Sequence, residues 1–358
     1  MFTFTMTQAR KTVVSKEETG VYHCMSRCVR RAFLCGLDSY TGKNYEHRRE
    51  WVQSRLKELS GLFGVEMFSY AVMSNHLHVV LRTRPDWVSG WSGDEVAERW
   101  CRVFRGKAAI QAGKPYDELK FERIRKDPER VATCRERLKD LSWFMRCLNE
   151  SLAKRANLED RCTGRFWEGR FKCQRLMDEG AILACMAYVD LNPIRARMAD
   201  GLEDSHFTSV YDRVIARRAK GRLERLGEVQ NPTPAQKREI AREEKRSHQS
   251  QWLVALEDEG SAFRGMDEET YLSLVEWTGR NIRVDKPGYI PVGLEKVLAR
   301  FELDAAEWAK NVAAYGSLFH RIAGRAEQLA AYAQLKGQSW FRGRSGGESL
   351  YRCEKTAA

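Results

Sequence analysis

The segment NHLHVVL, residues 75–81, places two histidines one residue apart within an apolar run. Side chains two residues apart in a β-strand point to the same face of the sheet, so His76 and His78 are expected to project together. The opposite face receives Leu77, Val79 and Leu81, a continuous apolar stripe that the core is expected to bury. The histidines then lie on the other face, where they either bind a metal ion jointly or form local hydrogen bonds while half-exposed.

The patterns around this strand predict a β-α-β-β order. Residues 20–36 begin with a loose alternation of apolar and polar side chains, which indicates a strand followed by a turn. Residues 46–62 carry apolar side chains at helical spacing. Residues 68–82 are typical of two strands with a break at 73–75. Further along the chain, an amphipathic helix is expected at about 137–156.

A second helix is expected to begin near Asp178 and to be stopped by Pro193. Its core face consists of Ile182, Leu183, Met186 and Val189. Tyr188 lies roughly opposite this face among small residues, and Asn192 follows on the same side one turn later. We therefore expect open space around the Tyr188 hydroxyl. The alternatives are that Tyr188 only covers the surface and that Asn192 only ends the helix before the proline.

Composition divides the chain into three parts. Residues 1–215 are expected to form the first domain, in which the charged and weakly periodic segment 91–135 is a helical insertion. Residues 216–250 are rich in Arg, Lys and Glu and contain an Asn-Pro-Thr-Pro sequence, which favours a charged linker. Residues 251–358 are expected to form a mostly helical C-terminal domain of unknown role.

The whole chain of 358 residues carries 61 Lys and Arg against 49 Asp and Glu, a formal net charge of +12. This excess favours a polyanionic partner such as nucleic acid, although many soluble proteins are basic without binding DNA. No apolar run approaches the ~18 residues of a membrane span, and the N-terminus lacks the apolar core of a secretory signal. We therefore expect a cytoplasmic protein without a membrane partner. The ten cysteines form no C-x-x-C pair, which argues against a zinc ribbon or finger.

A basic segment with interleaved aromatic residues, RCTGRFWEGRFKCQR, occupies residues 161–175. Its charges suit phosphates and its rings suit unstacked bases, as in proteins that bind single-stranded or hairpin DNA. The candidate DNA contacts are Arg161, Arg165, Trp167, Arg170, Lys172 and Arg175, together with Arg27 and Arg30 near the first strand. The alternative is that Phe166 and Trp167 pack under the sheet while the arginines are merely solvated.

Three motifs occur in a fixed order: NHLHVVL at 75–81, WEGRFK at 167–172 and YVDLNPIRA at 188–196. Together they resemble the REP-associated tyrosine transposases, which belong to the insertion-sequence-200-like, single-tyrosine HUH superfamily. HUH denotes two histidines around one hydrophobic residue, as in the His-Leu-His at 76–78. The resemblance covers about residues 15–215. The additional segment within this range and the long C-terminal region depart from a compact member of the family.

The resemblance implies an α+β fold, with a ferredoxin-like antiparallel sheet and helices on one face. It also implies that His76, His78 and Asn192 hold a divalent cation, Mg²⁺ or Mn²⁺. Tyr188 would be the nucleophile that cleaves and rejoins single-stranded or hairpin DNA through a covalent 5′-phosphotyrosine. Repetitive extragenic palindromes are the DNA targets that the family name suggests, and a homodimer is expected because family members often act as dimers.

Two other functions remain open at this point. The protein could be a metal-dependent phosphodiesterase that activates water, with Tyr188 in a structural role only. It could also be a domesticated DNA-binding protein that is derived from a transposase and is no longer catalytic. The presence of both histidines, the tyrosine and the asparagine argues against this last function.

Overall fold

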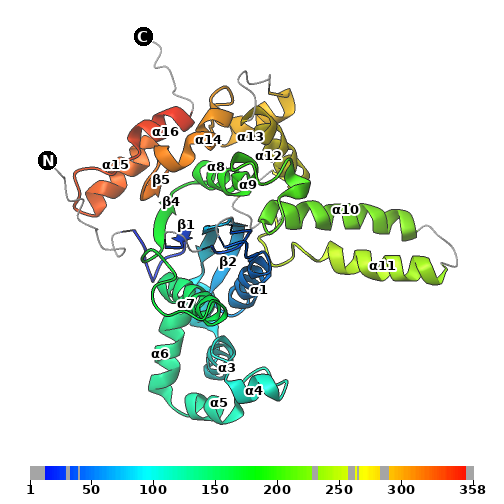
Figure 1. The fold of residues 1–358 in the computed structure, drawn as a ribbon. Helices are drawn as coiled ribbons and strands as arrows, with labels where there is room; N and C mark the ends of the chain where they lie inside the picture. The colour runs from blue at the N-terminus through cyan, green and yellow to red at the C-terminus, as the bar shows by residue number, and fades with distance from the viewer. Residues whose placement is uncertain are drawn as a thin grey trace. The chain divides into compact units, whose positions relative to one another are not determined.

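The computed structural model describes residues 13–29, 33–38, 41–227, 233–256, 263, 266–282 and 290–351 of the chain. The chain divides into two compact units. Figure 1 labels the helices and strands. The first unit consists of Met1–Glu66 and Leu81–Arg175, and the second consists of Met67–Val80 and Leu176–Ala358. This division differs from the domain boundaries at 215 and 251, which stay predictions.

A five-stranded sheet with the strand order β2-β3-β1-β4-β5 is the central β structure. Its strands are β1 (Gly20–Arg27), β2 (Val65–Val72), β3 (His76–Thr83), β4 (Lys172–Leu176) and β5 (Ile322–Ala323). Helices occupy most of the remaining described chain. The fold is therefore of the α+β class, as the sequence predicts.

The strands β2 and β3 form an antiparallel hairpin around residues 73–75, where the sequence predicts a break. The Met73 amide donates a hydrogen bond to the His76 carbonyl at 2.9 Å, which closes the turn. The apolar stripe of β3 is fully buried, as predicted. His78 is also buried, with 2% of its surface exposed, whereas His76 on the same face is partly exposed. The alternative of two half-exposed histidines does not hold for His78, because an aromatic side chain of the second unit contacts its ring.

The first unit contains α1 (Arg48–Ser60) and α7 (Leu141–Glu159), which pack against each other. Between β3 and α7 the chain forms α2 (Pro85–Gly90), α3 (Gly93–Val103), α4 (Lys107–Gln111), α5 (Glu118–Arg125) and α6 (Pro128–Leu138). Ser92, Asp117 and Asp127 cap the N-termini of α3, α5 and α6 by accepting hydrogen bonds from backbone amides. The segment 91–135 is thus built from short, individually capped helices.

The second unit is mostly helical. It contains α8 (Glu179–Asp190), α9 (Asn192–Arg195), η2 (Leu202–Asp204), α10 (Ser209–Gly227), α11 (Pro234–Ser247), α12 (Glu268–Ile282), α13 (Val292–Arg300), α14 (Trp308–Leu318), α15 (Ala326–Leu335) and α16 (Arg344–Leu350). In the described part of the chain, no helix is long and apolar enough to span a bilayer.

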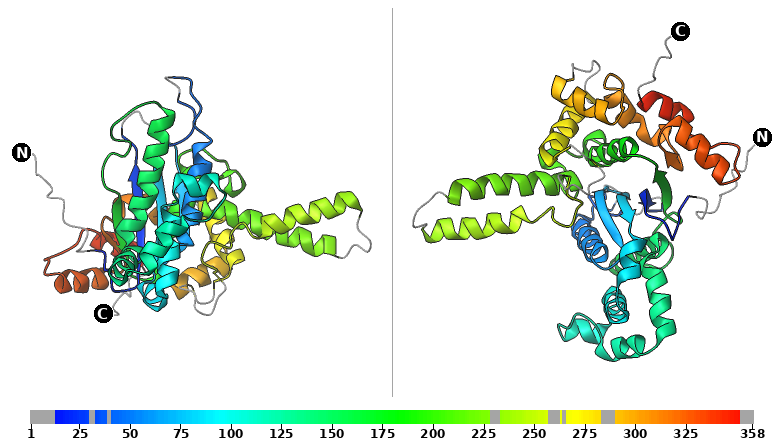
Figure 2. Two further views of the ribbon diagram at one scale, coloured as in Figure 1. Left: turned by 90° about the horizontal axis from the view of Figure 1, so that it is seen from below. Right: turned by 180° about the vertical axis from the view of Figure 1, so that it is seen from behind.

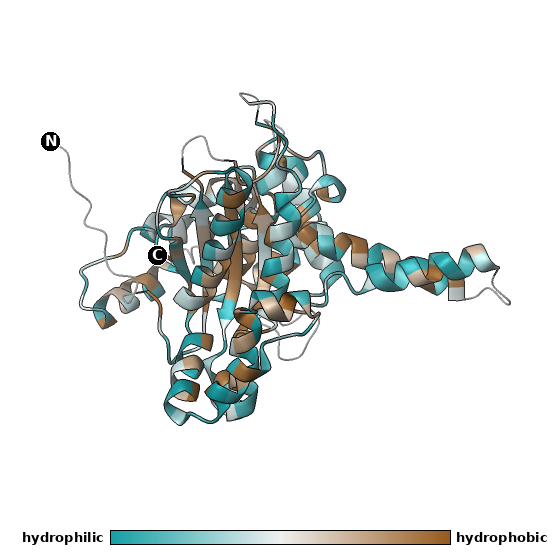
Figure 3. Ribbon diagram, turned by 60° about the horizontal axis from the view of Figure 1, so that its bottom comes forward, coloured by the Kyte–Doolittle hydropathy of each residue, from teal (hydrophilic) through white to brown (hydrophobic). Residues whose placement is uncertain are grey.

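The segment expected to be a charged linker forms most of α10 and all of α11 (Figure 2). These two helices lie side by side as a hairpin. The hairpin is mainly hydrophilic along its length, whereas the strands of the sheet are hydrophobic (Figure 3). Two charged helices can pair in this way because Ala216 and Ala219 of α10 are buried, whereas most of the charged side chains are exposed.

Helix α8 begins where the sequence predicts, because the Asp178 carboxylate accepts a hydrogen bond from the Ala181 amide at 2.8 Å. The helix ends at Asp190, and Pro193 lies in the first turn of α9, where its missing N–H costs nothing. The C-terminal helices pack here: α14 packs on α8, and α12 packs on α9 and α14. The region after residue 251 therefore shares one compact unit with the helix that carries Tyr188.

Candidate active site

His76 and His78 lie next to each other on β3, as strand alternation predicts. Their ring centroids are 4.9 Å apart and the ring planes meet at 81°. The Nδ1 atom of His76 is 2.7 Å from the Asn75 side-chain oxygen. A proton on Nδ1 would be donated to this oxygen, which leaves the lone pair of the ring on Nε2, the atom that can bind a metal.

The geometry of the two imidazoles fits a shared divalent cation. Two rings that bind one ion at ~2.1 Å have centroids roughly 4.5–5.5 Å apart when the angle at the ion lies between a right angle and the tetrahedral angle. Among the described residues, no three or more His, Cys, Asp or Glu side chains are placed to hold a metal ion. Within the described residues, a third protein ligand would therefore be of another type, and the amide oxygen of Asn192 is of a suitable type.

Asn192 lies at the start of α9 and is 8% exposed. Its Nδ2 atom donates a hydrogen bond to the Tyr188 carbonyl at 3.1 Å. This bond spans one turn and holds the amide group on the side of the helix that carries Tyr188. It uses the amide nitrogen, so the amide oxygen keeps its capacity as a ligand.

Tyr188 lies beside the histidine pair, where three side chains surround its ring. The ring centroid is 5.8 Å from that of His78, with the planes at 89°. The Tyr315 ring of α14 lies 5.3 Å away at 34°. The guanidinium carbon of Arg195 lies 4.5 Å from the centroid of the Tyr188 ring. The structure therefore brings His76, His78 and Tyr188 together, as the sequence hypothesis requires.

The surroundings of the Tyr188 hydroxyl differ from the sequence expectation. A Cβ atom added to Gly316 would lie 2.9 Å from the Tyr188 Oη atom, so α14 closely approaches the hydroxyl. Ala181, Ala184 and Cys185 on the same helix are fully buried. Tyr188 stays partly exposed, but its hydroxyl is less open than expected, because the sequence pattern of α8 alone does not show that α14 packs on its second face. The small residues make room for that helix rather than for solvent.

Asp190, two residues after Tyr188, is a buried anchor that the sequence patterns above do not single out. Its Oδ1 atom accepts hydrogen bonds from the Ser69 hydroxyl at 3.0 Å, from the Val210 amide at 3.2 Å and from the Ser209 hydroxyl. Its Oδ2 atom accepts one from the Tyr271 hydroxyl at 2.5 Å. Burial raises the pKa of Asp190, and the donated hydrogen bonds oppose this shift. The sequence feature that could have indicated this role is a carboxylate at the end of a mostly apolar helix.

All the candidate DNA contacts that the structure describes belong to the first unit. Arg30 lies outside the described residues. The exposed members are Arg27, Arg161, Arg165, Arg170 and Lys172. Arg175 is mostly buried and lies 3.8 Å from Glu18. Trp167 donates a hydrogen bond from Nε1 to the Asn149 carbonyl at 2.8 Å, and its ring packs edge-on against Phe166. Phe166 and Phe171 are buried, so these two rings are core residues rather than platforms for bases.

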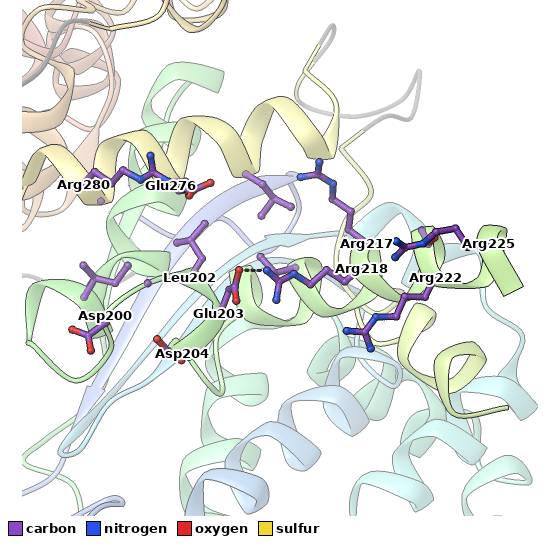
Figure 4. A pocket seen from close by; sticks show the side chains of 16 residues that line it. Asp200, Leu202, Glu203, Asp204, Arg217, Arg218, Arg222, Arg225, Glu276 and Arg280 are labelled. Carbon is purple, nitrogen blue, oxygen red and sulfur yellow. Dashed lines mark hydrogen bonds and ion pairs between the residues drawn. The ribbon is translucent and has the colours of Figure 1, made fainter. Parts of the chain in front are cut away.

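A cavity of about 1080 Å³ lies between α10, α12 and η2 of the second unit (Figure 4). Its charged lining includes Arg217, Arg218, Arg222, Arg225 and Arg280. Most of these arginines already contact a carboxylate. Arg218 pairs with Glu203 and Arg280 pairs with Glu276, both within the cavity lining. The positive charge is locally balanced, so we assign no ligand to this cavity.

The sequence matches no protein-family model, and no curated protein matches it. Among solved structures, the chain is similar to a REP-associated tyrosine transposase bound to a REP hairpin. The two share 11% sequence identity with a TM-score of 0.35, over 58% of this chain and 86% of that chain. A likeness this distant establishes neither the family nor the activity of this chain.

Proposed function

We propose that the second unit carries the active site of a single-tyrosine transposase that cleaves and rejoins single-stranded or hairpin DNA. The contact between the Tyr188 ring and the His78 ring, 5.8 Å between centroids, is the observation that carries this proposal. It joins a candidate nucleophile from α8 to a histidine pair from β3. These segments are more than a hundred residues apart in the chain, so their proximity is a property of the fold.

The strand order supports the fold that the family resemblance implies. A β-α-β-β-α-β chain whose strands lie in the order 2-3-1-4 has the ferredoxin-like arrangement. The strands β1 to β4 follow this order, with α1 between β1 and β2 and with α7 before β4. The short strand β5 adds to the β4 edge. We propose that this arrangement is the HUH nuclease fold, with the histidines on β3.

The proposed reaction is a phosphoryl transfer to a tyrosine. The Tyr188 Oη atom attacks a DNA phosphorus, an O–P bond forms, and the bond between phosphorus and the 3′ oxygen breaks. The phenolic proton is lost, the 3′ oxygen leaves as a hydroxyl, and the DNA 5′ end stays on the tyrosine. The phosphodiester energy is kept, so a second 3′-hydroxyl can reverse the step and join a new strand.

His76, His78 and Asn192 are the residues that would hold a divalent cation, Mg²⁺ or Mn²⁺. Such an ion supplies Lewis-acid polarisation of a phosphoryl oxygen. The chain's own contribution is to orient the ligands: Asn75 orients the His76 ring, and the Tyr188 carbonyl orients the Asn192 amide. The exposed cations of the first unit, Arg161 and Arg165 among them, are proposed to contact the DNA backbone.

The test is a covalent adduct assay with a 3′-labelled DNA hairpin and Mn²⁺, read on a denaturing protein gel. Wild-type protein should form a labelled adduct, and Tyr188→Phe should form none. Tyr116→Phe, which changes a tyrosine of the first unit, is the matched control and should keep the wild-type yield. DNA cleavage that survives Tyr188→Phe without an adduct would sink the proposal and favour a phosphodiesterase that uses water.

A further inference from the structure

Arg195, the last residue of α9, is a charged side chain that lies over the Tyr188 ring. Its guanidinium carbon lies 4.5 Å from the centroid of the Tyr188 ring, and its Nη1 atom is buried without a hydrogen-bond partner. Among the residues that the structure describes, no carboxylate pairs with it. We infer that Arg195 binds a phosphate group of the DNA at Tyr188. This inference deepens the proposed function and rests on it.

Arg213 and Arg325 of this unit also carry a buried nitrogen without a hydrogen-bond partner, but each pairs with a carboxylate through another nitrogen. Arg213 is more deeply buried, but it contacts the Glu268 carboxylate at 3.1 Å and the Val254 carbonyl at 2.9 Å. A guanidinium is always charged, and a buried donor without an acceptor carries a free-energy cost. Such an exception is explained when a ligand supplies the missing acceptor. An anion is the ligand that satisfies both the charge and the hydrogen-bonding capacity of Arg195.

The backbone holds Arg195 on the side of the candidate nucleophile. Tyr188, Asn192 and Arg195 are spaced four and three residues apart, and Leu191 between α8 and α9 keeps a helical conformation. The Arg195 amide donates a hydrogen bond to the Leu191 carbonyl at 2.9 Å, which continues the turn. Residues at this spacing lie along one side of a helix. One short motif thus aligns a phenol, an amide and a guanidinium.

Stacking against the Tyr188 ring leaves a guanidinium able to bind phosphate. The guanidinium carbon lies over the ring, and a guanidinium that packs on an aromatic ring by its flat face keeps its N–H groups available in its own plane. Two of these N–H groups match two phosphate oxygens in a bidentate contact. Negative charge on the transferring phosphoryl group would therefore meet a positive charge held over the ring of the attacking tyrosine. A purely structural cation–π contact would stabilise the ring and nothing more.

The first test measures DNA binding in the Tyr188→Phe background, where no adduct forms. The slope of the logarithm of the association constant against the logarithm of salt concentration reports the number of phosphate contacts. Arg195→Ala should reduce this slope by about 0.7, the value for one contact to a single strand. The matched control is Arg197→Asn, because Arg197 has a φ of 57°, a conformation that Asn tolerates. An unchanged slope for Arg195→Ala overturns the inference.

The second test measures the rate of adduct formation. Arg195→Ala should lower it about 100-fold, as for the loss of one donor to a transition-state oxyanion, and Arg195→Lys should lower it less. Guanidinium ion at millimolar concentration should restore part of the rate to Arg195→Ala, and an equal concentration of sodium chloride should not.

A rate loss without rescue and with an unchanged salt slope assigns Arg195 a packing role and contradicts the inference. A wild-type protein that forms no adduct refutes the proposed function, and the salt slope then decides the role of Arg195 separately.

Discussion

The side chain of Tyr188 is held on several sides by residues from three segments of the second unit. His78 contacts one edge, Tyr315 lies tilted against the ring, and Arg195 lies over it. Gly316 closely approaches the hydroxyl. Ring contacts of this kind contribute roughly 0.5–1.5 kcal/mol each, so together they restrict the rotamer of the tyrosine. A fixed rotamer is what in-line attack on a phosphate requires.

Gly316→Ala should reduce activity without unfolding the protein. The added methyl group would meet the Tyr188 Oη atom at 2.9 Å, and the far end of that side chain can move away. Alanine in place of glycine within a helix gains up to about 1 kcal/mol, which offsets the contact. We expect an unchanged thermal midpoint within about 3 °C and an adduct rate that is lowered roughly 10-fold.

Gly293→Ala is the matched control for this prediction, because a Cβ atom at Gly293 of α13 would meet nothing within 4 Å. It should leave the adduct rate unchanged. A wild-type rate for Gly316→Ala would show that the Tyr188 hydroxyl does not depend on the close approach of α14.

His76→Ala should abolish DNA cleavage and leave most of the DNA affinity. The predicted role of His76 is to bind a divalent cation, whereas phosphate contacts elsewhere supply most of the binding energy. Cleavage assays with and without EDTA, together with fluorescence anisotropy of labelled DNA, measure the two effects. Cleavage at the wild-type rate in EDTA would contradict the metal role.

At the scale of secondary-structure elements, Asp190 connects four parts of the second unit. Hydrogen bonds from Ser69 of β2, Ser209 and Val210 of α10, and Tyr271 of α12 meet on its carboxylate. Helix α8 is thereby anchored close to Tyr188. The position of the candidate nucleophile therefore depends on a polar network as well as on apolar packing.

Asp190→Ala should destabilise the protein by about 3 kcal/mol, because several buried donors lose their acceptor. Asp190→Asn should cost less. Burial raises the pKa of Asp190, which means that the fold disfavours its charge, and the amide keeps an acceptor oxygen. Urea unfolding followed by circular dichroism measures both changes. Glu224→Ala, which removes an exposed carboxylate of α10, is the control and should change stability by less than about 0.5 kcal/mol.

Strand β1 of the first unit carries His23, whose burial lowers its pKa to about 4, although a hydrogen bond with Gln174 opposes this shift. The folded state therefore keeps His23 neutral between pH 6.5 and 4, whereas the unfolded state binds a proton. The free energy of unfolding should fall as the pH drops through this window, by up to about 3 kcal/mol from this residue. Unfolding in urea at several pH values measures the slope.

His23→Gln should flatten this dependence between pH 6.5 and 4. The exposed His206 provides the matched control, and His206→Gln should keep the wild-type slope. Identical slopes for His23→Gln and wild type would show that His23 is protonated to the same extent in both states.

At the scale of the whole molecule, the second unit combines early and late parts of the chain. It contains Met67–Val80 together with everything after Leu176. Tyr271 of α12 donates to Asp190, and α14 covers the Tyr188 side of α8. The C-terminal helices thus complete the surroundings of the candidate active site.

A fragment of residues 1–250 should therefore fail to unfold cooperatively. It would expose the buried faces of α8 and α9 and leave Asp190 without the Tyr271 hydroxyl. Thermal scans by circular dichroism and size-exclusion chromatography compare it with the full chain. A monomeric fragment with a sharp transition would show instead that residues 251–358 form an independent domain.

Much of the local structure could be predicted from the sequence. Strand alternation predicts the β2–β3 hairpin and the shared face of His76 and His78, and helical periodicity with Asp178 predicts the start of α8. These features depend on residues that are close in the chain, so their periodicity reports them directly. The ordered motifs then brought Tyr188 and Asn192 into one hypothesis with the histidines.

The sequence by itself determined which chemical groups are present: a pair of imidazoles on one face of a strand, and a phenol, an amide and a guanidinium along one helix. Only the tertiary structure decided what surrounds them. Helix α14 approaches the Tyr188 hydroxyl, Asp190 gathers donors from β2, α10 and α12, and Arg195 has no carboxylate partner in the part of the chain that the structure describes. These contacts join residues that are far apart in the chain, and local periodicity carries no information about which distant helix will pack on a given face.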